Sequence, residues 1–104
     1  MIQDVMVQYG MSKMRECWLC GRNDNGFDRL ELHHIFGGAN RWKSEKYGLT
    51  VWLCGKRCHR LDKYAVHQNA ETMLLLHQYG QRKAMMEQGW TVERFIEVFG
   101  KNYL

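Results

Sequence analysis

Two pairs of cysteines constrain this chain more than any other feature of its sequence. Cys17 and Cys20 are separated by two residues, and Cys54 and Cys58 are separated by three. Such spacings are typical of knuckles, which are turns that direct two thiolates at one ion, and four thiolates complete the tetrahedral shell of Zn²⁺. We therefore expect a structural zinc site that ties two distant parts of the chain together.

The fourth zinc ligand has an alternative. The second knuckle is one residue longer than the usual C-x2-C, and His59 directly follows Cys58. An imidazole can replace a thiolate in a structural zinc site. Cys58 is the expected ligand, because His59 also fits a second metal site described below.

The length of the chain limits the number of domains. Its 104 residues suffice for one compact domain, and the hydrophobic fraction of 45% is ordinary for a folded protein. We expect a single α+β domain over 1–104, with the zinc knuckles in a core at 17–67 and a helical extension at 68–104. A domain of this size buries a modest part of its surface, so a bound metal would contribute to its stability.

The sequence carries no signal for a membrane. No apolar run approaches the roughly 20 residues that cross a bilayer, and the first residues lack the basic and apolar regions of a signal peptide. We expect a cytoplasmic protein with no membrane partner. In a reducing compartment, four cysteines are more often metal ligands than disulfides.

Two short strands are expected in the first half of the chain. Residues 30–33 alternate apolar and polar side chains, and residues 49–53 are rich in β-forming types. A turn is expected at 23–26, and a basic loop at 37–48 is expected to join the strands.

Helices are expected in the second half. The pattern becomes helical after Cys54, and the next helix spans roughly 70–87. A last helix begins after Thr91 and ends at Gly100, which are favourable capping residues. Residues 1–16 show no firm period. The side chains expected to face the core are Met73, Leu76, Gly80 and Ala84 in the long helix and Val92, Phe95, Ile96 and Phe99 in the last one.

The positive charge is concentrated in the middle third of the chain. Residues 35–67 carry seven Lys or Arg residues against two Asp or Glu residues, which accounts for the net charge of +4. Such a segment suits nucleic acid, and the alternative is a solvated loop and helix face. Trp42 lies in this segment, where it either anchors the loop, the favoured role, or stacks on a ligand. The expected phosphate-binding residues are Arg41, Lys43, Lys46, Lys56, Arg57 and Arg60.

Two adjacent histidines, His33 and His34, end the first expected strand. Neighbouring side chains of an extended segment point to opposite faces, so the two imidazoles are suited to different tasks. His77 lies inside the amphipathic helix, where a structural role is expected.

This arrangement resembles a known family, the HNH or His-Me finger endonucleases, and more narrowly the small phage-encoded members. The resemblance covers roughly 17–67. It rests on Leu32-His33-His34-Ile35, the basic loop with Gly37-Gly38, the strand end Leu53-Cys54, Cys58-His59 and Val66-His67. It implies a ββα-metal finger that hydrolyses phosphodiester bonds of DNA, nicking one strand as a monomer or cutting both strands as a homodimer.

The resemblance also implies roles for the histidines. His33 and His59 would hold a divalent catalytic cation such as Mg²⁺, Mn²⁺, Ni²⁺ or Zn²⁺, and His34 would be the general base. For His67 two roles remain open, a third ligand or a capping residue. If the chain continued as one helix, His67 would lie two turns from His59, so ligation requires a break near 64–65.

One position departs from the family. The central Asn, which braces the loop bearing the base, is replaced by Leu49, and Asn40 or a backbone group is expected to take over. The alternative function is a non-catalytic, zinc-containing module that binds nucleic acid. A third, weaker alternative is a phage protein that acts on a host protein partner.

Overall fold

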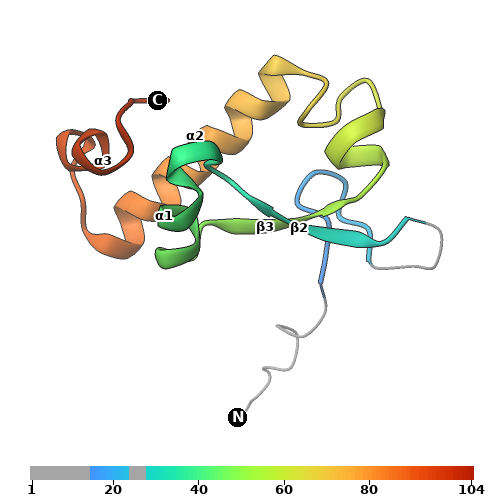
Figure 1. Ribbon diagram of the computed structural model, residues 1–104, viewed down its shortest axis with the longest axis horizontal. Coiled ribbons are helices and arrows are strands. Elements are labelled where there is room, and N and C mark those ends of the chain that lie inside the picture. The colour runs from blue at the N-terminus through green and yellow to red at the C-terminus, as the bar shows by residue number, and fades with distance from the viewer. Residues whose placement is uncertain (1–14, 24–27) are drawn as a thin grey trace, which may run out of the picture.

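The computed structural model describes residues 15–23 and 28–104 (Figure 1). Most of the turn expected at 23–26 and most of the unassigned segment 1–16 lie outside these residues. The described chain is a mixed α+β protein whose strands come first and whose longest helices come last. Its elements are β2 (Leu30–His34), η2 (Gly38–Asn40), α1 (Arg41–Lys46), β3 (Thr50–Cys54), η3 (Arg57–Leu61), α2 (Ala70–Gln88) and α3 (Val92–Phe99).

The two expected strands pair with each other. β2 and β3 form a two-stranded antiparallel sheet in which Leu30 lies opposite Cys54 and His34 lies opposite Thr50. Both strands are confirmed to within one residue of the expected bounds. The register places the cysteine of β3 at one end of the sheet and the two histidines of β2 toward the other.

The connection between the strands is helical rather than an open loop. η2 and α1 occupy 38–46, and Gly48 adopts a left-handed φ of 69° after α1. The reason is a buried contact that local sequence patterns do not report: the fully buried Ser44 hydroxyl bonds both the backbone N–H and the carbonyl of Phe36 at 2.9 Å. This contact holds α1 against the end of β2.

The helix expected to continue beyond Cys58 is not formed. η3 is a single π-helical turn, and the chain then folds back on itself through a series of turns. The N–H of Val66 donates to the carbonyl of Cys58 at 2.8 Å, and the N–H of His67 donates to the carbonyl of His59 at 3.1 Å. The fold-back gives these two carbonyls hydrogen-bond partners and buries Val66.

The C-terminal helices are confirmed, together with most of their inner faces. Leu76, Gly80 and Ala84 of α2 are buried, and Met73 packs against the core. A Cβ atom on Gly80 would lie 2.6 Å from Cγ2 of Ile35, so a glycine permits this close approach. In α3, Phe95 and Phe99 are buried, whereas Val92 is half-buried and Ile96 is exposed, contrary to expectation.

The helix ends agree with the capping residues. Thr91 caps α3 by accepting a hydrogen bond from the N–H of Arg94 at 3.1 Å, and Gly100 ends it in a left-handed conformation. Asn69 caps α2 in the same way, through the N–H of Thr72.

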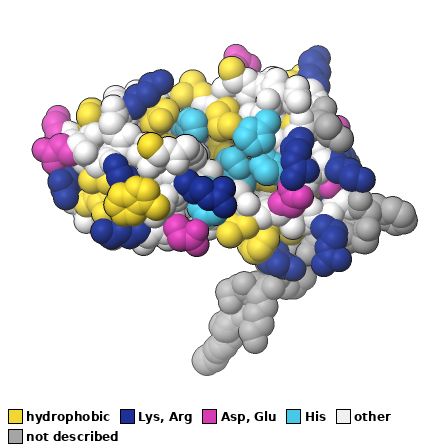
Figure 2. Space-filling model, in the orientation of Figure 1, with side chains coloured by type: hydrophobic (Ala, Val, Ile, Leu, Met, Phe, Trp, Pro, Cys, Tyr) yellow, Lys and Arg dark blue, Asp and Glu magenta, His cyan; other side chains and the backbone are white. Residues whose placement is uncertain are grey.

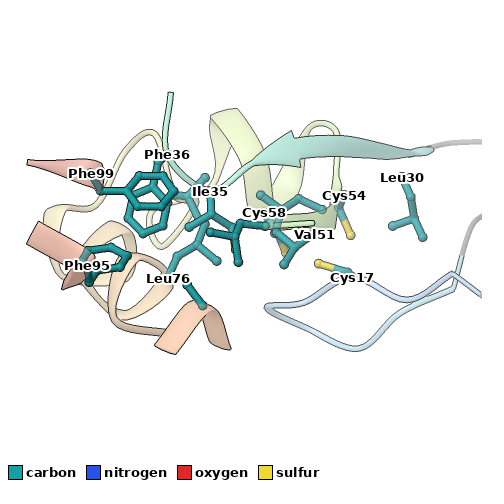
Figure 3. Packing of buried hydrophobic residues seen from close by; sticks show 14 residues of the cluster. Cys17, Leu30, Ile35, Phe36, Val51, Cys54, Cys58, Leu76, Phe95 and Phe99 are labelled. Atoms are coloured by element: carbon teal, nitrogen blue, oxygen red, sulfur yellow. The ribbon is translucent and has the colours of Figure 1, made fainter. Parts of the chain in front are cut away.

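The core runs beneath the sheet from an aromatic end to a sulfur-rich end (Figure 3). Phe36, Phe95 and Phe99 gather at the first end, where Phe36 and Phe99 have ring centroids 4.8 Å apart. At the other end, the sulfur atoms of Cys17 and Cys54 face each other. Within the described part of the chain, no helix combines the length and apolar character that a bilayer crossing requires.

Candidate metal centres

All four cysteines meet at one end of the sheet. The Sγ atoms of Cys17, Cys20, Cys54 and Cys58 lie within 4.8 Å of one another. The Sγ atoms of Cys20 and Cys54 are 3.6 Å apart, and the edge of a tetrahedral zinc–thiolate site with bonds of about 2.3 Å is about 3.8 Å. None of the four is in a disulfide. The group therefore has the composition and spacing of a site for an ion such as zinc.

Local turns direct these thiols. The N–H of Cys17 donates to the carbonyl of Arg22 at 2.9 Å, and Gly21, with a φ of 78°, closes the first knuckle. The N–H of Cys20 points at Sγ of Cys17 across 3.5 Å. Cys17 also forms a bridge to Trp52, so the knuckle is fixed against β3.

Burial and the close approach of the thiols shift the pKa values of Cys20, Cys54 and Cys58 in different directions. Burial raises the pKa of Cys54 and of Cys58, and hydrogen bonds with neighbouring cysteines raise it further. Burial also opposes ionisation of Cys20, but hydrogen bonds from the Arg22 backbone and the other thiols outweigh it and lower the pKa of Cys20 to about 7. A divalent cation would remove this conflict, because it favours all four thiolates at once.

Arg22 and Asp28 support the cysteine cluster from outside. Nη2 of Arg22 donates to Sγ of Cys54 at 3.0 Å and forms an ion pair with Asp28 at 3.4 Å. The Asp28 carboxylate in turn accepts hydrogen bonds from the backbone N–H groups of Lys56 and Arg57. The first knuckle and the turn of the second are thus linked by one charged pair.

Three histidines form a second group. The ring nitrogens of His33, His59 and His67 that could ligate an ion all lie within 4.8 Å of one another. Nδ1 of His33 is 3.2 Å from Nε2 of His59, close to the edge of about 3.3 Å expected for a tetrahedron with metal–nitrogen bonds of about 2.0 to 2.1 Å. The fold-back after η3 creates this group by bringing His67 beside His59.

The arrangement bears on two alternatives left open by the sequence. Cys58 lies with the cysteines, whereas its neighbour His59 lies with the histidines. His67 faces the other two imidazoles, with ring centroids 5.5 Å from His33 and 4.7 Å from His59. His67 therefore belongs to the histidine group, which could hold an ion.

His33 is the most buried of the three grouped histidines. Its Nε2 atom is buried and has no hydrogen-bond partner among the described residues, and the residue is only 9% exposed. Burial, followed by the charges of His59 and His67, lowers the pKa of His33 to about 4. The ring is therefore neutral at pH 7, which is the form that binds a metal.

A carboxylate stands behind the histidine group. Glu31 precedes His33 by two residues on β2, so both side chains lie on the same face of the strand. Oε1 of Glu31 accepts a hydrogen bond from Nδ1 of His59 at 3.1 Å and another from Arg60. These bonds, from Arg60 first, hold the pKa of Glu31 below its usual value. A Cβ on Gly55 would lie 2.9 Å from Cδ of Glu31, so glycine leaves the room that this carboxylate occupies.

His34 stands apart from the three grouped imidazoles. Its Nε2 atom is 2.7 Å from Oε1 of Glu45, a residue of α1. The His34 side chain is 9% exposed, whereas that of Glu45 is 68% exposed. A carboxylate that accepts the Nε2–H bond leaves Nδ1 as the ring atom able to take a proton.

The segment after His34 is braced by a backbone group and by Ser44, and not by the Asn40 side chain. The side chain of Asn40 donates to the carbonyl of Phe99 at 3.0 Å and so fixes the end of α3. The buried Leu49 contributes its backbone carbonyl, which accepts from the N–H of Ile35 at 3.0 Å. Ser44 adds the two bonds to Phe36 described above. The backbone of Leu49 therefore supports the segment after His34, which is one of the two substitutes expected from the sequence. The Ser44 hydroxyl adds to this support.

The expected phosphate-binding residues lie on α1 and around η3. The side chains of Arg41, Lys46, Lys56 and Arg57 are exposed, whereas Lys43 donates to the carbonyl of Val98 and Arg60 binds Glu31. Figure 2 shows histidine side chains grouped at the surface, with basic side chains on both sides and an acidic one beside them. The face that exposes the imidazoles is thus also a basic face.

Trp42 does not anchor the segment between the strands. Its side chain is 61% exposed, and the anchoring contacts come instead from Asn40, Lys43 and Ser44. The favoured role for this tryptophan is therefore wrong.

Several residues of the two centres were missed by sequence reasoning. For Glu31 a signal existed, because a carboxylate two residues before a candidate ligand shares its face on a strand. No comparable signal marks Arg22, Ser44 or Glu45, because their partners are distant in the chain.

Comparison of the chain with protein-family models, with curated proteins and with solved structures gave no match.

Proposed function

We propose that this protein is a metal-dependent DNA endonuclease of the HNH kind. In this proposal β2, β3 and η3 form a ββα-metal unit, and the four cysteines hold a structural Zn²⁺. The observation that carries the proposal is the placement of the four histidines near the sheet. Three of them converge, while His34 remains outside that group and is paired with a carboxylate.

The three converging imidazoles would hold the catalytic ion. His33, His59 and His67 supply three nitrogen donors, a set that suits Mn²⁺, Ni²⁺ or Zn²⁺ better than Mg²⁺ and leaves coordination positions free. A bound divalent cation supplies charge relief for the phosphate and for the departing 3′-oxygen. Glu31 orients His59 by holding its Nδ1–H, so Nε2 is the donor atom.

His34 would act as the general base. Glu45 accepts the Nε2–H bond, so Nδ1 takes a proton from water as the water oxygen attacks phosphorus. The bond between phosphorus and the 3′-oxygen breaks, which leaves a 5′-phosphate and a 3′-hydroxyl. The exposed basic side chains of α1 and η3 would contact neighbouring phosphates, and this contact carries no sequence preference by itself.

The proposal is tested by nicking of supercoiled plasmid DNA. Zinc-loaded protein is assayed with added Mn²⁺, Ni²⁺ or Mg²⁺, and wild type is compared with His34→Ala. We expect the variant to fold, to keep its zinc and to lose about 10²- to 10⁴-fold in rate, the usual contribution of a positioned base. Glu87→Gln is the control, because this carboxylate pairs with Lys83 on the surface of α2 and its loss should leave nicking intact.

Two results would overturn the proposal. Wild-type protein that binds DNA but never nicks it, with any of the three ions, would favour the non-catalytic zinc module. Undiminished nicking by His34→Ala would remove the assignment of the base.

A further inference from the structure

Trp42 is an exposed aromatic side chain on α1. Its position on the outer side of α1 leaves the indole 61% exposed, while the neighbouring Ser44 is fully buried. An indole in water forgoes the stabilisation that burial of a large aromatic ring provides. An exposed aromatic ring of this kind is available to contact a bound ligand.

The ring borders an open hollow in the surface. The hollow has a volume of about 490 Å³ and is lined by Gly38, Ala39, Arg41, Trp42 and Glu45. Glu45 links it to the proposed catalytic site, because the same carboxylate contacts His34. A molecule seated beside Trp42 would therefore lie next to the proposed general base.

The charge around the ring is positive. The Nζ atoms of Lys43 and Lys46 lie 5.8 and 5.9 Å from the centroid of the Trp42 ring, and Arg41 lines the hollow itself. An aromatic face among cations matches a nucleotide, whose base stacks on the ring while its phosphate meets the cations.

We propose that Trp42 stacks on an unpaired base of the DNA strand bound at the site. This inference rests on the proposed nuclease function and adds the class of substrate. A base within a duplex is already stacked on both faces, so a ring in this hollow favours DNA that is single-stranded or locally opened beside the cleaved bond.

A second surface hollow provides the control. Tyr79, Arg82, Lys83, Met86 and Glu87 line an opening of about 440 Å³ on α2, which also combines apolar, basic and acidic side chains. Met86 is 79% exposed, yet none of these side chains contacts the histidines of the proposed site within the described structure. Met86→Ala therefore removes an exposed apolar side chain without touching the hollow at Trp42.

The test measures binding without cleavage. In the full-length, zinc-loaded His34→Ala protein, fluorescence anisotropy compares a labelled 16-nucleotide thymidine strand with a strand of equal length built from abasic units. Stacking on one base corresponds to about 5- to 150-fold in affinity. We expect Trp42→Ala to lose affinity in that range for the thymidine strand and to change little for the abasic strand. Trp42→Phe should retain most of the affinity, and Met86→Ala all of it.

Equal losses on both strands would overturn the inference, because a loss independent of the bases reports charge or folding. An unchanged affinity of Trp42→Ala for the thymidine strand would do the same. The nuclease proposal is tested separately, by plasmid nicking with the wild-type protein. Its failure can therefore be told apart from either of these two binding results.

Discussion

Glu31 accepts a hydrogen bond from Nδ1 of His59 at 3.1 Å, and this contact determines which nitrogen of His59 faces the other imidazoles. The free Nε2 atom then lies 3.2 Å from Nδ1 of His33. Carboxylates in this position commonly fix the tautomer and orientation of a ligating histidine. Glu31 is thus a positioning residue for the proposed ion.

The first prediction concerns this carboxylate. Glu31→Gln should weaken binding of Mn²⁺ or Ni²⁺ to zinc-loaded protein by about 10- to 100-fold, the usual effect of losing an outer partner of a ligand. Isothermal titration calorimetry measures the change. Glu87→Gln is the matched control, because Glu87 pairs with Lys83 on the surface of α2. Identical affinities for Glu31→Gln and wild type would refute the role of Glu31.

The second prediction concerns the cysteine group. Cys17→Ser should abolish zinc binding and unfold the domain, because Cys17 is buried and the binding free energy of a structural zinc is about 10 to 16 kcal/mol. That exceeds or equals the entire stability of most domains, about 5 to 15 kcal/mol. Zinc content and circular dichroism are the measurements. A folded variant without zinc would show that the ion is dispensable for the fold.

The third prediction tests whether Ser44 supports the backbone after His34 in addition to stabilising the fold. Ser44→Ala leaves the buried N–H and carbonyl of Phe36 without their partner and should cost about 1 to 3 kcal/mol in urea unfolding. It should also slow nicking, because the backbone that follows His34 loses its support. Thr91→Ala is the control: loss of the α3 cap should cost about 1 kcal/mol and leave nicking unchanged. Equal rates for both variants would argue against the brace.

The fourth prediction concerns pH. Burial lowers the pKa of His77, which stacks on Phe36 with ring centroids 5.2 Å apart. The folded state therefore binds a proton less readily than the unfolded state, whose histidine has a pKa of about 6.5. The stability linked to His77 is present above that pH and is lost as the pH falls through the folded-state value. The difference in unfolding free energy between wild type and His77→Phe should be constant above pH 7 and should shift against wild type toward pH 5. A pH-independent difference would contradict this linkage.

The sequence predicts those parts of the structure that depend on local spacing. The cysteine pairs, the strands around His33 and Val51, and the capped C-terminal helices were all expected, because each is encoded within a few neighbouring residues. The path after Cys58 was not, because its helical pattern is overridden by the burial of Val66 and the bonds back to residues 58 and 59. Tertiary contacts of this kind override the local helix propensity of the sequence.

The helix α1 was missed for a similar reason. Its sequence is polar and too short to show a period, and it is stabilised by Ser44 against Phe36 and by Lys43 against the end of α3. Glu45 reaches His34 only because this helix forms. The histidines of the candidate site were therefore predictable from the sequence, whereas the carboxylates that contact them were not.

One peptide bond joins the two centres, since Cys58 belongs to the sulfur cluster and His59 to the imidazole cluster. An ion withdrawn from the first would shift the backbone that carries a donor of the second. Under zinc starvation, the proposed cutting activity would then fail even where the second cation is plentiful, and the protein would respond to the supply of both metals through this one peptide bond.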